Sequence, residues 1–143
     1  MDDQLNFANM FSAGRESIQK FDYYFLGVII ALLSLSIQTF NPLVTPKFIF
    51  LINIVWILLL VSMLSGFRRL EKIQLINHYD TRRIYEMEYE GEVANSLRIK
   101  KYYELSDELN KKSVYLYKIE KWSFIAALLV YLVFKLLNIY FTA

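Results

Sequence analysis

Basic and aromatic side chains gather between the second and third apolar stretches of the sequence. Tyrosines, including Tyr102 and Tyr103, lie among five cations there. The cations are Arg82, Arg83, Arg98, Lys100 and Lys101. Lysine and arginine contact phosphates, and tyrosine rings stack on bases. The pattern therefore indicates a site for a nucleotide or an oligonucleotide ligand.

Alternative roles for this cluster stay open. Tyrosines at helical spacing also form cores, and arginine near glutamate also makes a solvated helix face. The acidic run from Glu86 to Glu92 argues against a broad nucleic-acid surface and could pair with cations of a neighbouring chain. His78, about one turn before Arg82, suggests a membrane-bound nuclease, because histidine and arginine can share phosphate cleavage.

The amino-acid composition excludes several kinds of catalytic and metal-binding site. The chain has no cysteine and one histidine, which excludes a disulfide framework, a thiol nucleophile and most zinc sites. It also has no phosphate-cradling glycine loop and no serine–histidine pairing. We therefore assign no catalytic residue, metal or cofactor, and expect a protein that is not an enzyme.

Small and polar residues recur at helical spacing within the apolar stretches. They occupy one face of the first stretch, at Gly27, Ala31, Ser34 and Gln38, and a shorter face of the second, at Ser62 and Gly66. Such faces allow membrane helices to approach closely. They serve either helix packing within one subunit or an interface of an oligomer or pore.

A second polar pattern appears when residues are compared by their depth in the membrane. Successive spans run in opposite directions, so the end of one span lies at the same depth as the start of the next. Four polar residues should lie in the outer half of the membrane: Gln38, Asn53, Lys135 and Asn138. Lys135 can extend to the headgroups. Alternatively, this layer lines a polar path or joins subunits, because polar groups in hydrocarbon tend to face protein or water.

Three apolar stretches dominate a chain that is 56% hydrophobic, and each has about the 20 residues that span a bilayer. They cover residues 24–40, 48–66 and 122–141. The sequence predicts an all-α membrane protein with three transmembrane helices and a helical hairpin between the second and third. The expected segments are an N-terminal segment 1–22, a transmembrane hairpin 23–66, a helical domain 67–121 and a third span 122–143.

The distribution of basic residues predicts how the chain is oriented in the membrane. Two basic residues precede the first span, one lies in the loop 41–47, and twelve lie in 67–121. By the positive-inside rule, the N-terminus and residues 67–121 are cytoplasmic and the C-terminus is outside. Topology and headgroup contacts account for the cations beside the membrane, which are Arg68, Arg69, Lys72, Lys118 and Lys121.

Local signals predict where the helices begin and end. Residues 1–22 could form a short amphipathic helix that carries Phe7, Phe11 and Ile18. Thr45 and Pro46 are typical of the start of a helix, here the second span. A turn is expected at Gly91, Asn95 and Ser96, followed by a new helix start at Ser106.

Two close spans, the first opening with Tyr24-Phe25-Leu26-Gly27 and the second covering 48–66, lead into a charged, tyrosine-rich helix. This architecture, over roughly residues 20–105, resembles the SLATT-type transmembrane effectors of prokaryotic conflict systems, to which the chain adds a third span. The resemblance implies a pore-forming or membrane-disrupting effector in antiviral defence that a nucleotide or oligonucleotide signal controls from the cytoplasm. We expect its location to be the bacterial inner membrane.

Together these features predict a homo-oligomeric membrane channel or effector, because one subunit with three spans has no room for an ion path. Its cytoplasmic helices would sense a nucleotide, an oligonucleotide or a protein partner. The alternative is a non-conducting adaptor in the lipid bilayer that docks a soluble partner protein.

Overall fold

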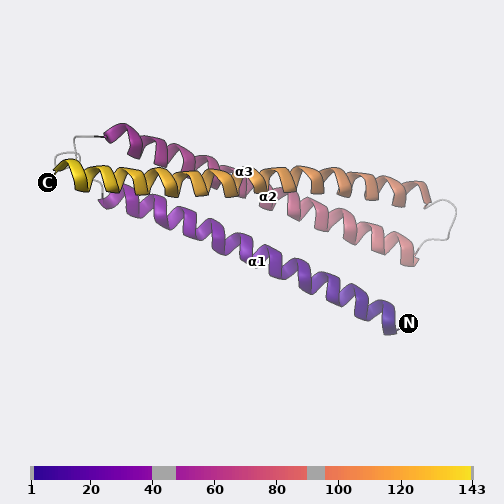
Figure 1. The fold of residues 1–143 in the computed structure, drawn as a ribbon. Coiled ribbons are helices and arrows are strands. Elements are labelled where there is room, and N and C mark those ends of the chain that lie inside the picture. The colour runs from indigo at the N-terminus through magenta and orange to yellow at the C-terminus, as the bar shows by residue number, and fades with distance from the viewer. Residues whose placement is uncertain (1, 40–47, 90–95, 143) are drawn as a thin grey trace.

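The computed structural model describes the backbone of residues 2–39, 48–89 and 96–142, and the side chains of 16–38, 48–84 and 97–140. These residues form three helices, α1 (Asp2–Thr39), α2 (Ile49–Tyr89) and α3 (Ser96–Thr142). α1 and α3 run in one direction and α2 runs in the other (Figure 1). Each helix contains a stretch long and apolar enough to cross a membrane, which confirms an all-helical protein with three membrane-length helices.

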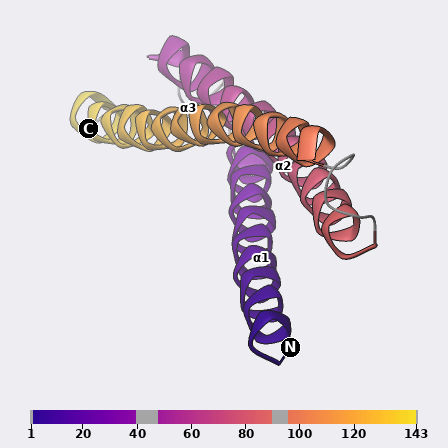
Figure 2. The same ribbon diagram turned by 90° about the vertical axis from the view of Figure 1, so that its right-hand side faces the viewer.

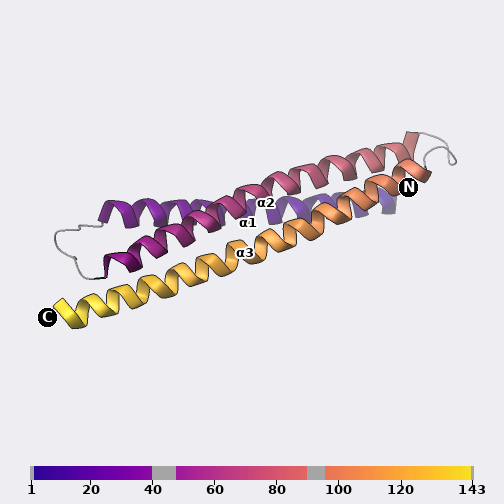
Figure 3. The ribbon, with the colours of Figure 1, turned by 90° about the horizontal axis from the view of Figure 1, so that it is seen from above.

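Each helix is about twice as long as a bilayer requires, with 38, 41 and 47 residues. α2 and α3 pack along their length (Figure 3), whereas α1 makes fewer contacts and diverges toward its N-terminus (Figure 2). We call residues 67–84 of α2 and 97–121 of α3 the arm. The arm is the part of the α2/α3 pair beyond the apolar stretches.

The core lies between the apolar stretches and contains residues from all three helices: Ile29, Ile52, Val55, Leu59, Ala127 and Phe134. On α2 these positions are three and four apart, and the same spacing continues through the buried Ser62 and Gly66. That spacing places one face of α2 against α3, as in a coiled coil. Phe25 of α1 meets Phe124 of α3 edge to face, with ring centroids 5.1 Å apart.

The predicted helix start at Ser106 is wrong, because α3 begins at Ser96 and continues through Ser106. The Ser106 hydroxyl does not cap a helix; it donates a 3.0 Å hydrogen bond to the buried carboxylate of Asp80 on α2. The N-terminal segment is helical but not a separate short helix, since α1 is continuous from Asp2 to Thr39. The signals at Thr45, Pro46, Gly91 and Asn95 lie outside the described residues.

Candidate functional site: a buried ionic cluster

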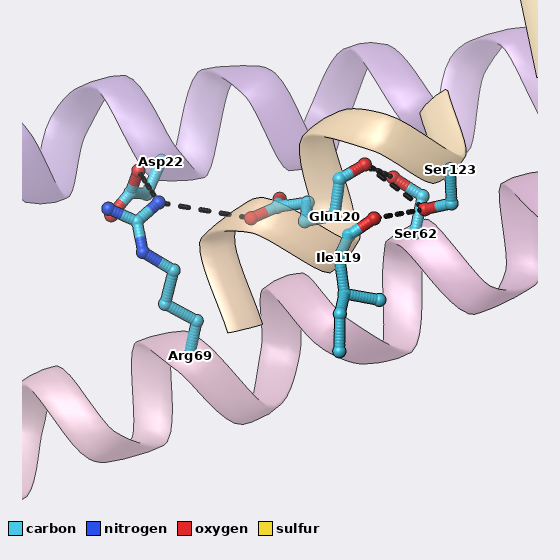
Figure 4. A network of polar contacts seen from close by, with 6 residues as sticks. All are labelled: Asp22, Ser62, Arg69, Ile119, Glu120 and Ser123. Atoms are coloured by element: carbon cyan, nitrogen blue, oxygen red, sulfur yellow. Dashed lines mark hydrogen bonds and ion pairs between the residues drawn. The ribbon is translucent and has the colours of Figure 1, made fainter. Parts of the chain in front are cut away.

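Three charged residues, one from each helix, meet where the apolar stretches end. Asp22 precedes the first stretch, Arg69 follows the second and Glu120 precedes the third. The Arg69 guanidinium lies between the two carboxylates (Figure 4). Because α2 runs opposite to α1 and α3, this meeting sets the three apolar stretches at a common level. We call Asp22, Arg69 and Glu120 the ionic cluster.

The two ion pairs of the cluster differ in geometry. Arg69 donates from Nη1 to Asp22 Oδ1 at 2.5 Å, whereas the same nitrogen lies 3.8 Å from Glu120 Oε2. All three side chains are withdrawn from solvent, with 12% of Arg69, 4% of Asp22 and 2% of Glu120 exposed. Asp22 is therefore the close partner of Arg69, and Glu120 is a distant one.

Neighbouring groups hold the cluster in place. The Tyr117 ring lies under the guanidinium, 4.4 Å from the arginine carbon Cζ to the ring centroid, which is cation–π distance. Ser62 on α2 donates a 2.8 Å hydrogen bond to the backbone carbonyl of Glu120. Gly66 leaves room for the Glu120 carboxylate, since a Cβ built there would lie 2.5 Å from Oε1. The small residues at 62 and 66 thus bring α2 close to α3 at the cluster.

The cluster is electrostatically unbalanced, with two carboxylates for one guanidinium. Among the described residues, Asp22 Oδ2, Glu120 Oε2 and Arg69 Nε are buried without a hydrogen-bond partner. A buried polar group without a partner is costly, so the cluster contributes to stability mainly through the close pair of Arg69 and Asp22. The cluster joins α1 to α2 and α3 at this level.

No family model, curated protein or solved structure matches the chain. The geometry of the chain itself therefore has to indicate its function.

The predicted ligand site lies at the far end of the arm from the ionic cluster, on two neighbouring helices. Tyr79 and Tyr102 stack across α2 and α3, with ring centroids 6.1 Å apart, and Arg83 lies over the Tyr103 ring at 5.7 Å. The remaining four cations are solvent-exposed: Arg82, Arg98, Lys100 and Lys101. The structure thus packs tyrosines and one arginine together and leaves the other cations facing outward.

Gln38 and Asn53 of the predicted polar layer lie at a similar level, and three of its four residues face away from the core. Trp56 of α2 donates a 3.0 Å hydrogen bond to Ser36 of α1, which aligns these two positions. Gln38 and Asn53 lie within about 5 Å of that level along their helices. Gln38, Asn53 and Lys135 are exposed, whereas Asn138 is buried.

The two small-residue faces differ in burial: the face on α2 is buried and the face on α1 is exposed. Ser62 and Gly66 are buried between α2 and its neighbours, which is packing within the subunit. Gly27, Ala31 and Ser34 are all exposed, and a Cβ added at Gly27 would meet no atom within 4 Å. This face of α1 is therefore open in the single chain.

His78 is exposed on α2, with its ring against Tyr79 at 5.9 Å. Within residues 16–38, 48–84 and 97–140, no group of three or more His, Asp or Glu side chains could hold a metal ion. The nuclease hypothesis therefore still depends on His78 and the neighbouring arginines.

The sequence pattern did not predict the ionic cluster, because topology alone accounted for Arg69, and Asp22 and Glu120 had no predicted role. Each acidic residue is the one nearest to an apolar stretch, which is the available signal. That signal does not show that the residues meet, because Asp22 and Arg69 are 47 positions apart.

Proposed function

We propose that this protein is a homo-oligomeric membrane channel or pore-type effector, with the arm and the N-terminus in the cytoplasm. The observation that carries the proposal is the exposed small and polar face of α1, with Gly27, Ala31, Ser34 and Gln38 all facing outward. In a bilayer, polar groups on a helix tend to face protein or water, and small residues favour helix contacts. A neighbouring subunit or an aqueous path would provide suitable surroundings for both the polar and the small residues of this face.

The ionic cluster supports a coupling step in this proposal. It is a charged junction between α1, which carries the open face, and the α2/α3 pair, which carries the arm. A tilt of α2 or α3 would change the 3.8 Å separation of Arg69 and Glu120 before the closer pair with Asp22. Movement of the arm would then be transmitted to α1.

The exposed cations at the end of the arm support a phosphate-bearing signal as the stimulus. Arg82, Arg98, Lys100 and Lys101 begin about 25 Å beyond the second apolar stretch, out of reach of headgroups. A nucleotide or an oligonucleotide would contact them, consistent with a role like that of SLATT-type effectors in antiviral defence at the bacterial inner membrane.

A non-conducting adaptor is the second candidate. Apolar side chains are exposed at the same end of the arm, namely Ile84, Leu97 and Tyr103. Such a surface suits a soluble protein partner.

We expect bulky residues on the open face of α1 to break the assembly without unfolding the chain. Gly27→Leu and Ala31→Leu should each weaken association roughly tenfold, because close helix approach needs small residues. Light scattering or mass photometry of detergent-purified protein would show loss of the oligomer at unchanged helical content. Val133→Phe, which adds bulk at an exposed position of α3, is the matched control. A monomeric wild-type protein would contradict the proposal.

Reconstituted liposomes test conduction directly. Wild-type protein should release ions, and Gln38→Leu with Asn53→Leu should lower the flux while the oligomer mass is unchanged. The physical reason is that these exposed polar groups would face the water path. Flux equal to that of protein-free liposomes, together with partner binding by the intact protein, would instead support the adaptor.

A further inference from the structure

Lys135 carries a positive charge that no aspartate or glutamate of the chain can neutralise. The sequence contains no Asp or Glu from Tyr23 to Leu70, and none after Glu120. Glu120 is 15 residues before Lys135 on the same helix, about 22 Å away. The Lys135 ammonium instead lies over the Tyr131 ring, 5.6 Å from its centroid.

Lys135 is also one of the residues that line an apolar groove. The groove has a volume of about 310 Å³ and is open to the surroundings of the protein. All three helices line it, with Leu35 and Ser36 from α1, Leu59 from α2, and Leu128, Tyr131 and Lys135 from α3. Ligand sites typically have such walls, mostly apolar with few polar groups.

We propose that this groove binds an anionic phospholipid, with an acyl chain against the leucines and the headgroup phosphate paired with Lys135. Lys135 is seven residues before Thr142, the last helical residue, or about 10 Å along the axis. In the structure the ammonium is turned back toward Tyr131, and a rotamer that extends the side chain toward Thr142 would cover part of that distance to the headgroups. The phosphate supplies the charge that the chain lacks at this level.

Charge favours a lipid over a second copy of the chain as the occupant. A second copy brings the same apolar stretches, which contain no carboxylate. It could fill the groove with leucine side chains but would leave Lys135 unneutralised. The inference goes beyond the proposed function, because lipid binding does not require the assembly to conduct.

Native mass spectrometry and thermal unfolding in detergent, with phosphatidylglycerol or phosphatidylcholine added, test this site. Wild-type protein should retain phosphatidylglycerol preferentially and should be stabilised by it. Lys135→Gln should weaken that binding about fivefold, as expected for one cation near a lipid phosphate, and Lys135→Arg should restore it. Lys111→Gln, at an exposed lysine of the arm outside the predicted ligand site, should bind like wild type.

A second variant tests the groove separately from the charge. Leu128→Trp should fill the groove and reduce binding of phosphatidylglycerol while Lys135 stays in place. Equal binding of the two lipids, or wild-type binding by Lys135→Gln, would overturn the proposal. Cross-linking that places α1 of a second copy in the groove in the presence of phosphatidylglycerol would also overturn it.

Discussion

Replacing Arg69 with leucine should destabilise the protein by about 3–5 kcal/mol, because the change leaves two buried carboxylates without the guanidinium that lies between them. Without the Arg69–Asp22 ion pair, α1 loses its charged contact with α2 and should separate from the α2/α3 pair. Thermal or SDS-induced unfolding of the purified protein would measure the loss of stability. Trp56, which is hydrogen-bonded to Ser36 of α1, provides a fluorescence signal of that separation.

Two charge-neutralising variants are the controls for Arg69→Leu. Each leaves one carboxylate with one guanidinium, so they differ in geometry and not in net charge. Asp22→Asn loses the 2.5 Å charged hydrogen bond and should cost about 1.5–3 kcal/mol. Glu120→Gln loses only the 3.8 Å pair and also removes the surplus buried charge of the cluster, so it should cost less than Asp22→Asn. Equal costs for the two would contradict the unequal roles assigned here.

Because the chain has no cysteine, an engineered pair can report where α1 lies. Phe25→Cys with Phe124→Cys puts one thiol on α1 and one on α3 where the two rings meet. A bifunctional thiol-reactive cross-linker, which spans more than a disulfide, should join this pair efficiently in the wild-type background and poorly with Arg69→Leu. Efficient cross-linking in both backgrounds would show that the ionic cluster does not hold α1.

The effect of Gly66→Ala should change sign with the residue at position 120. In the wild-type chain the new Cβ would meet Glu120 Oε1 at 2.5 Å and Leu26 Cδ1 at 3.1 Å. Such overpacking costs about 1–3 kcal/mol, which exceeds the roughly 1 kcal/mol that alanine gains over glycine in a helix. With Glu120→Ala the nearer obstacle is gone, and Gly66→Ala should then be neutral or stabilising.

A double-mutant cycle over these two positions measures the coupling. Gly27→Ala is the matched control, since its Cβ meets open space in the single chain. Its effect should be the same with Glu or Ala at position 120. If Gly66→Ala costs the same in both backgrounds, the Glu120 carboxylate does not occupy the space beside Gly66.

The presence of three membrane-length helices was predictable, because the thickness of the bilayer requires only a minimum length of apolar sequence. A run of about 20 apolar residues satisfies that limit whatever its neighbours are. The three membrane-length helices therefore follow from hydropathy alone. The continuity of α3 through Ser106 did not follow, because a serine followed by acidic residues is also a helix-start signal, and only Asp80 on the facing helix decides its role.

The faces of the helices were harder to assign, because lipid and protein core are both apolar. Leu26 and Ile29 of α1 are buried, while Gly27 on another face of the same helix is open. Hydropathy cannot separate these faces, since all of these residues are compatible with the hydrocarbon core of a bilayer. Only the packing of α2 and α3 against the other side of α1 therefore defines which face of α1 is open.

By itself the sequence determined the number of membrane-length helices and the charge bias that predicts their orientation, because each depends on local composition. Only the tertiary structure decided that Asp22, Arg69 and Glu120 form one cluster and that Lys135 borders a groove. These features depend on the register and rotation of three separate helices. Side-chain packing sets both, through contacts between residues far apart in the chain.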